Sequence, residues 1–139
     1  MTETPGIELV FFPDVEAALV ATLRPILDVP VVTRVPNPRP PRFVRLIRVG
    51  GGRANRITDS PMVTFEAWAD PKTGGGDVAA FELARTARAH INGLAGSWAG
   101  GVWVRRVVDI AGPPSYPDPE TGTSRYQMTL QLDVRGTPG

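Results

Sequence analysis

The sequence predicts one α+β domain over residues 1–139, with a mostly antiparallel sheet of about five strands and two helices packed on one face. Hydrophobic residues make up 42% of the chain and charged residues 21%, which provides enough apolar surface for a core. Two segments repeat apolar residues at helical spacing, and several shorter segments alternate apolar and polar residues. The elements follow one another as helix, three strands, helix and two strands. This order suits a sheet covered by both helices on the same side.

Both predicted helices have an apolar stripe and a start signal. The first follows Pro13 and Asp14, and its stripe consists of Val15, Ala18, Leu19, Thr22, Leu23 and Ile26. Because Pro25 cannot donate a backbone hydrogen bond, we expect this helix to end or bend near Arg24. The second helix starts at Asp77, has Gly93 as its C-terminal signal, and carries the stripe Ala80, Phe81, Ala84, Ala87, Ile91 and Leu94.

Five segments have the composition or the alternation of β-strands: residues 31–35, 43–49, 62–69, 102–110 and 126–134. The last has the clearest alternation, with the polar residues Gln127, Thr129, Gln131 and Asp133 on one face. In the segment 102–110, the apolar face contains Val102, Val104, Val108 and Ile110, with Arg106 as an exception. The proline-rich residues 36–41 form a stiff connector, and residues 50–61 form a long polar loop that we expect to be mobile in an isolated subunit.

The charge of the chain is unevenly distributed along the sequence. Net charge is +1, yet a window over residues 30–58 has no acidic residue and contains Arg34, Arg39, Arg42, Arg45, Arg48, Arg53 and Arg56. All 14 acidic residues therefore lie outside this window. Such an asymmetry is typical of head-to-tail contact between copies, of docking on an acidic surface, or of nucleic-acid binding. A solvated arginine-rich loop is the alternative.

The residues that enzymes use most often are scarce. The chain has no cysteine, and its one histidine, His90, has no metal ligand at helical spacing on its predicted helix. The Gly74-Gly75-Gly76 run before a helix lacks the lysine and hydroxyl residue of a nucleotide-binding loop. Asp118 and Glu120 are the nearest approach to a carboxylate pair, but they lie in a proline-rich turn. We therefore expect a protein without enzymatic activity, cofactor or metal.

The sequence also bears on the cellular compartment. Acidic Glu3 and Glu8 stand where a secretion signal has basic residues, and no apolar run approaches the roughly 20 residues that span a bilayer. We expect a cytosolic product with no membrane partner.

Nucleic-acid binding is the strongest competing function on the residues alone. The arginines from Arg34 to Arg56 can neutralise phosphates, and Phe43 can stack on a base. Against this, no aromatic residue besides Phe43 is interleaved with the arginines, the sequence pI is about 8.3, and no recognition helix accompanies them.

Several stretches together resemble the tail terminator, or tail completion, proteins of long-tailed bacteriophages of the siphophage type. They are Pro13-Asp14-Val15-Glu16 before a helix, Arg42-Phe43-Val44-Arg45 before the Gly50-Gly51-Gly52 run, the strand at 63–68 with Glu66, and Pro117-Asp118-Pro119-Glu120 before Arg125-Tyr126-Gln127. The likeness covers nearly the whole chain. It consists in the order of elements and the character of the loops, without a catalytic motif.

The resemblance implies a virion structural protein that forms a six-membered ring at the head-proximal end of the tail. Such a ring caps the tail tube, stops its polymerisation and joins the head connector. The implied partners are other copies of the chain, the major tail tube protein, the head–tail connector or stopper protein, and viral DNA that passes through without sequence-specific binding. Another phage neck or tail component is the runner-up.

Two sets of residues are assigned to this role. We expect an assembly interface that includes Arg42, Arg45, Arg48, Arg53, Asn55, Arg56, Asp118, Glu120 and Arg125. We expect the polar face of the last strand to line the ring's channel through Gln127, Thr129, Gln131 and Asp133, because a DNA conduit benefits from a hydrated wall.

Overall fold

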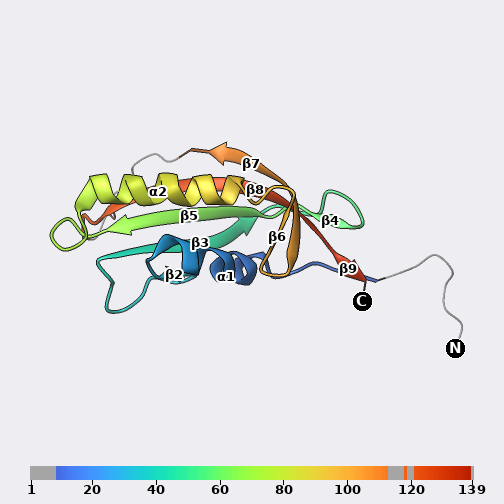
Figure 1. Ribbon diagram of the computed structural model, residues 1–139, viewed down its shortest axis with the longest axis horizontal. Coiled ribbons are helices and arrows are strands. Elements are labelled where there is room, and N and C mark those ends of the chain that lie inside the picture. The colour runs from blue at the N-terminus through green and yellow to red at the C-terminus, as the bar shows by residue number, and fades with distance from the viewer. Residues whose placement is uncertain (1–8, 113–117, 119–120, 139) are drawn as a thin grey trace, which may run out of the picture.

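The computed structural model describes residues 9–112, 118 and 121–138 as a sheet with both helices on one face (Figure 1). The α+β class and the placement of the helices agree with the sequence prediction. The sheet has seven strands instead of about five. Their order is β2 (Val31–Val32), β3 (Arg42–Gly50), β5 (Met62–Ala69), β8 (Ser124–Arg135), β7 (Val102–Ala111) and β6 (Ser97–Ala99), with β4 (Thr58–Asp59) beside β8. It is mixed, because β2 runs parallel to β3 while the other neighbours are antiparallel. A separate two-stranded sheet joins β1 (Val10–Phe11) to β9 (Thr137–Pro138).

Helix α1 (Val15–Leu27) begins at the residue that the sequence indicated. The Asp14 side chain accepts a hydrogen bond from the backbone N–H of Ala17 at 3.1 Å, which caps the helix. Of the two outcomes predicted at Arg24, an end or a bend, the end does not occur, because the helix continues through Pro25 to Leu27. A proline this close to the end removes only one hydrogen bond of the last turn, and Asp28 then ends the helix with a left-handed φ of 55°.

Helix α2 (Gly76–Asn92) packs over β5 (Met62–Ala69) and β8 (Ser124–Arg135). Its buried residues are close to the predicted stripe, with Leu83 buried in place of the predicted Phe81. Leu83 is buried, whereas Phe81 is 40% exposed and contacts Tyr126 edge-on at the rim of the core. Gly93 caps the helix as predicted, with its N–H bonded to the Ala89 carbonyl.

The hydrophobic core lies between the two helices and the face of the sheet they cover, here called the helix face. Strand β8 contributes Met128, Leu130, Leu132 and Val134 to it, as its alternation predicted. Strand β5 contributes Val63, Phe65 and Ala67, and β3 (Arg42–Gly50) contributes Val44 and Leu46. The opposite side of the sheet is here called the open face. It carries the residues that alternate with these core residues along each strand.

Strand β7 (Val102–Ala111) corrects the predicted assignment of faces. Val104 lies opposite Val134, but the next pair is Arg106 with Asp133, so Arg105 is the extra residue of a β-bulge. A bulge exchanges the faces of the residues that follow it, here as far as a second register shift between Asp109 and Ala111. Val107 therefore faces the helices, and Val108 shares the open face with Arg106. The prediction that Val104 and Val108 lie on one face is wrong.

Three short segments differ from the predicted loops and strands. Strand β2 (Val31–Val32) stops well before residue 35. Strand β6 (Ser97–Ala99) pairs with the start of β7 and was not predicted. The loop 50–61 is not irregular throughout, because β4 (Thr58–Asp59) pairs with β8 and the backbone N–H of Ala54 bonds the Thr58 carbonyl. Arg53 pairs with Asp59, so residues 53–59 form a hairpin, here called the β4 hairpin. The Asn55 side chain closes the β4 hairpin by accepting hydrogen bonds from the backbone N–H groups of Ile57 and Thr58.

Candidate functional site

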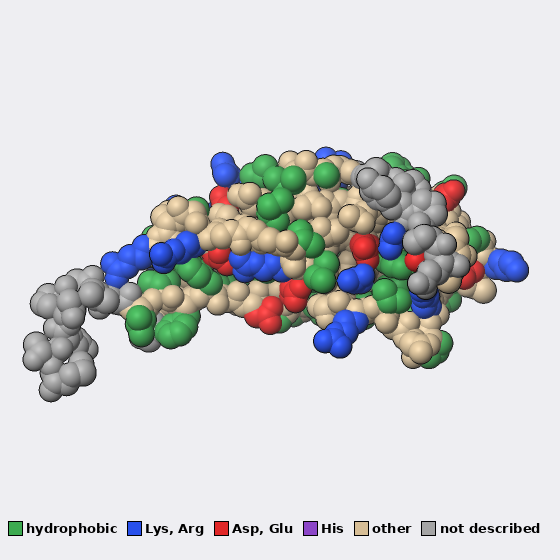
Figure 2. Space-filling model, turned by 180° about the vertical axis from the view of Figure 1, so that it is seen from behind, with side chains coloured by type: hydrophobic (Ala, Val, Ile, Leu, Met, Phe, Trp, Pro, Cys, Tyr) green, Lys and Arg blue, Asp and Glu red, His purple; other side chains and the backbone are tan. Residues whose placement is uncertain are grey.

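The open face of the sheet is a charged and polar surface. Figure 2 views the molecule from this side and shows basic and acidic side chains close together along the middle of the sheet. The predicted channel-lining residues Gln127, Thr129, Gln131 and Asp133 all lie on this face and are half-buried. Thr129 shares a 3.0 Å hydrogen bond with Thr64 of the neighbouring strand. The helices leave these four side chains uncovered, which is the condition that a channel-lining role requires.

At one end of the open face, a carboxylate gathers two arginines. Glu66 lies 3.3 Å from Arg45 and 4.0 Å from Arg125, and it accepts a hydrogen bond from the indole N–H of Trp68 at 3.3 Å. Trp68 stacks on Phe43 with ring centroids 5.2 Å apart. All three strands β3, β5 and β8 contribute to this group, here called the Glu66 cluster. It holds polar groups at low exposure, since the Glu66 side chain is only 10% exposed.

A turn after β7 is fastened to the Glu66 cluster. Arg39 lies over the Trp68 ring, with its guanidinium 5.1 Å from the centroid, and donates to Asp118 at 3.2 Å. The hydroxyl and the backbone N–H of Thr121 also donate to Asp118. The hydroxyl of Thr121, then Arg39, lower the pKa of the Asp118 carboxyl. Asp118 thus acts as a structural anchor for the proline-rich connector. Glu120, its predicted neighbour in the assembly interface, lies outside the described residues.

Three of the seven arginines of the window are paired with carboxylates within the subunit, which reduces the charge asymmetry that the sequence suggested. Arg45 pairs with Glu66, Arg48 pairs with Asp59 at 3.0 Å, and Arg39 pairs with Asp118. These acidic residues come from outside the window but lie beside it in space. Of the predicted interface residues, Arg42, Arg53, Asn55 and Arg56 are exposed, whereas Arg45, Arg48, Asp118 and Arg125 are occupied in contacts within the chain.

The two long edges of the sheet differ in how far neighbouring groups cover their backbone. Strand β2 covers only part of the β3 edge, and beyond it the Glu16 carboxylate accepts the backbone N–H of Arg48 at 2.7 Å. Strand β6 covers only Val102–Val104 of β7. Among the described residues, no strand lies outside β7 from Arg106 to Ala111. This edge, here called the β7 edge, presents backbone groups to whatever adjoins it.

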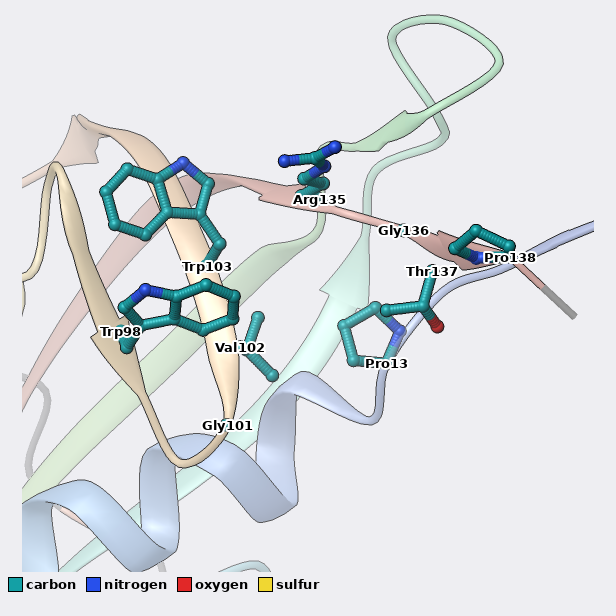
Figure 3. A pocket seen from close by; sticks show the side chains of 9 residues that line it. All are labelled: Pro13, Trp98, Gly101, Val102, Trp103, Arg135, Gly136, Thr137 and Pro138. Atoms are coloured by element: carbon teal, nitrogen blue, oxygen red, sulfur yellow. The ribbon is translucent and has the colours of Figure 1, made fainter.

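A pocket of about 200 Å³ lies where β6, β7, β9 and the start of α1 meet (Figure 3). Trp98 and Trp103 face one another across a hairpin with ring centroids 5.5 Å apart, and Trp98 is 68% exposed. Pro13, Val102 and Pro138 complete its apolar lining. The sequence analysis did not identify this pocket, although two tryptophans flanking Gly100-Gly101 are a hairpin signal. At Gly100, which has a φ of +54°, a Cβ would lie 2.7 Å from the Ala18 carbonyl oxygen, so only glycine fits against α1.

The candidate features for small-molecule chemistry do not come together. His90 is exposed on α2. In the turn before α2, the backbone N–H groups of Lys72 and Thr73 donate to the Asp70 carboxylate, so these two groups are already bonded within the chain. The two hydrogen bonds lower the pKa of Asp70. Within residues 9–112, 118 and 121–138, no group of three or more acidic or histidine side chains is arranged to hold a metal ion. No helix in the same part of the chain is both long and apolar enough to cross a membrane.

Comparison with known proteins adds no relative. No protein-family model matches the chain, and no curated protein matches it.

Proposed function

We propose that this protein is a virion structural protein, a tail terminator that forms a ring at the head-proximal end of a long-tailed phage tail. The observation that carries the proposal is the two-sided sheet. One face is covered by α1 and α2, and on the other no helix or strand of the described residues covers Gln127, Thr129 and Gln131. A subunit of this form can turn a hydrated face towards a channel and its helices outward. The resemblance of the sequence to tail terminators points in the same direction.

The surfaces of the subunit also suit a ring. A closed ring needs a heterologous contact, in which two different patches of each subunit meet. Among the described residues no strand covers the β7 edge, whereas β2 and one hydrogen bond from Glu16 cover part of the β3 edge, so the two sides of the sheet are not equivalent. Exposed apolar side chains lie at separate places, among them Trp98 beside the pocket and Val78, which is 76% exposed, on α2. Exposed apolar side chains of this kind can form the apolar centre that a stable interface contains.

Electron microscopy of phage particles tests the role directly. A labelled copy of the protein is expected at the junction of tail and head, and particles made without the protein should have tails of uncontrolled length that fail to join heads. His90→Ala is a suitable control, because the exposed imidazole has no assigned part and tails should be completed normally. Label at the distal tip or along the tube would assign the protein to another tail component. Its absence from particles would refute a virion role.

A further inference from the structure

One end of the molecule, around the β4 hairpin, gathers arginines from three distant parts of the sequence. Arg53 and Arg56 belong to the hairpin, Arg105 to the bulge of β7, and Arg135 to the end of β8; all four are exposed. We call this surface the arginine end. In Figure 2, basic side chains gather at the left end of the open face. The sequence window contained only the first two of these residues.

Pairing of β4 with β8 brings this group together. Thr58 lies opposite Arg135 in the register, and Arg105 donates to the Thr58 hydroxyl at 2.9 Å. Arg105 and Arg135 also line one pocket of about 250 Å³ together with Ile57 and Trp103. The two guanidinium groups therefore flank one hollow, and Arg105 is held in place by a hydrogen bond.

The carboxylates near the arginine end are paired with other arginines. Asp59 pairs with Arg48 at 3.0 Å, and Asp133 pairs with Arg106 at 3.1 Å. Asp133 also accepts from Ser60 at 2.7 Å. Among the described residues, neither Arg105 nor Arg135 forms an ion pair with a carboxylate. Arg105 and Arg135 thus add positive charge to the arginine end that no carboxylate of the described residues balances, and this charge attracts anions from outside.

We propose that the arginine end binds the phosphate backbone of duplex DNA without reading its sequence. The guanidinium group presents a planar set of donors that matches a phosphate, and arginines spread over a surface match a row of phosphates. Polar groups lie beside the arginines, since Asn55 and Thr58 line one hollow with Arg105, Arg106 and Asp133. No helix of the described residues belongs to this surface, so contacts to the DNA backbone provide the affinity. The proposal depends on the charge of this surface and does not require the role in the tail.

Salt-dependent binding of the purified protein to a fluorescein-labelled duplex of random sequence, measured by fluorescence anisotropy, tests the proposal. Each phosphate contact steepens the slope of log K against log salt concentration by about 0.9. Replacing Arg105 and Arg135 by glutamine should therefore make the slope shallower by about 1.8 and weaken binding roughly 60-fold at 0.1 M salt. Arg135→Gln alone should produce about half of the change in slope. This single variant leaves the Arg105 bond to Thr58 in place, so it separates binding from folding.

The matched control is the double variant Arg34→Gln and Arg42→Gln. It removes the same charge from two exposed arginines outside the arginine end. It should retain the wild-type slope to within about half of one phosphate contact. Three results would overturn the proposal: no binding at low salt, an equal loss in the control, or displacement of DNA by polyglutamate as effectively as by unlabelled duplex. The last result would assign the surface to an acidic protein. Failure in this assay leaves the microscopy of tails unaffected, so the two proposals can be judged separately.

Discussion

Removing the charge of Glu66 while keeping its shape should destabilise the fold by about 2 kcal/mol. In Glu66→Gln, the amide oxygen can still accept from Trp68 or Arg45, but two arginines lose their counter-charge at a site where the side chain is only 10% exposed. A hydrogen bond to a charged group contributes about 1.5–3 kcal/mol. The exposure of the Arg45 side chain, 27%, places the expected loss below the roughly 3–5 kcal/mol of a fully buried broken pair.

Urea unfolding followed by tryptophan fluorescence measures this loss, because Trp68 lies within the Glu66 cluster. For a chain of this size, about 2 kcal/mol also corresponds to a fall of roughly 6 °C in the thermal midpoint. Glu82→Gln is the matched control. The Glu82–Arg85 pair is 3.6 Å apart with side chains 56% and 64% exposed, so its loss should change stability by less than about 0.5 kcal/mol. If the two variants are equally stable, the Glu66 cluster does not stabilise the sheet as argued.

Three further predictions concern the turns, the acid limit and assembly. Gly100→Ala should lower the free energy of unfolding in urea by about 3 kcal/mol, because a left-handed φ and a backbone collision combine there. At Gly101 an added Cβ meets no atom within 4 Å, so Gly101→Ala should lower it by only about 1–2 kcal/mol. Equal losses in the two variants would contradict the collision. Arg88 bonding lowers the pKa of Asp109 below its usual 3.8, so the stability advantage of wild type over Asp109→Asn should be complete above that pH and shrink as the pH falls below it; an advantage that persists in strong acid would be inconsistent with this assignment. The double variant Arg53→Glu and Arg56→Glu, changed at two exposed positions, should keep its thermal midpoint but complete fewer tails, and a normal yield of tails would count against an assembly role for the β4 hairpin.

The regular parts of the fold were predictable because their side chains repeat. Strand β8 alternates without interruption, and α1 has both its apolar stripe and its Asp14 cap in the sequence. Strands β4 and β6 are too short to show a pattern, since each spans only two or three residues. Their formation depends on neighbours that come from elsewhere in the chain.

The surface was less predictable than the core, because charge along a sequence is not charge in space. The arginine window contains no acidic residue in the sequence, yet Glu66, Asp59 and Asp118 fold against it and pair with three of its seven arginines. Conversely, Arg105 and Arg135 lie outside the window and reach its far end through the pairing of β4 with β8. Long-range pairs of this kind leave no local signal in one sequence.

The bulge at Arg105 has a consequence for how this chain is aligned with others. Because one extra residue exchanges the faces of β7, a related protein that lacks the bulge is one residue shorter there and keeps every inward position inward. An alignment without a gap at Arg105 would then match Val107 to an outward residue and Val108 to an inward one, and so on as far as Asp109, where a second register shift follows. The similarity of the outer half would be lost although the structures agree. Searches for distant relatives should therefore permit a single-residue gap at this position.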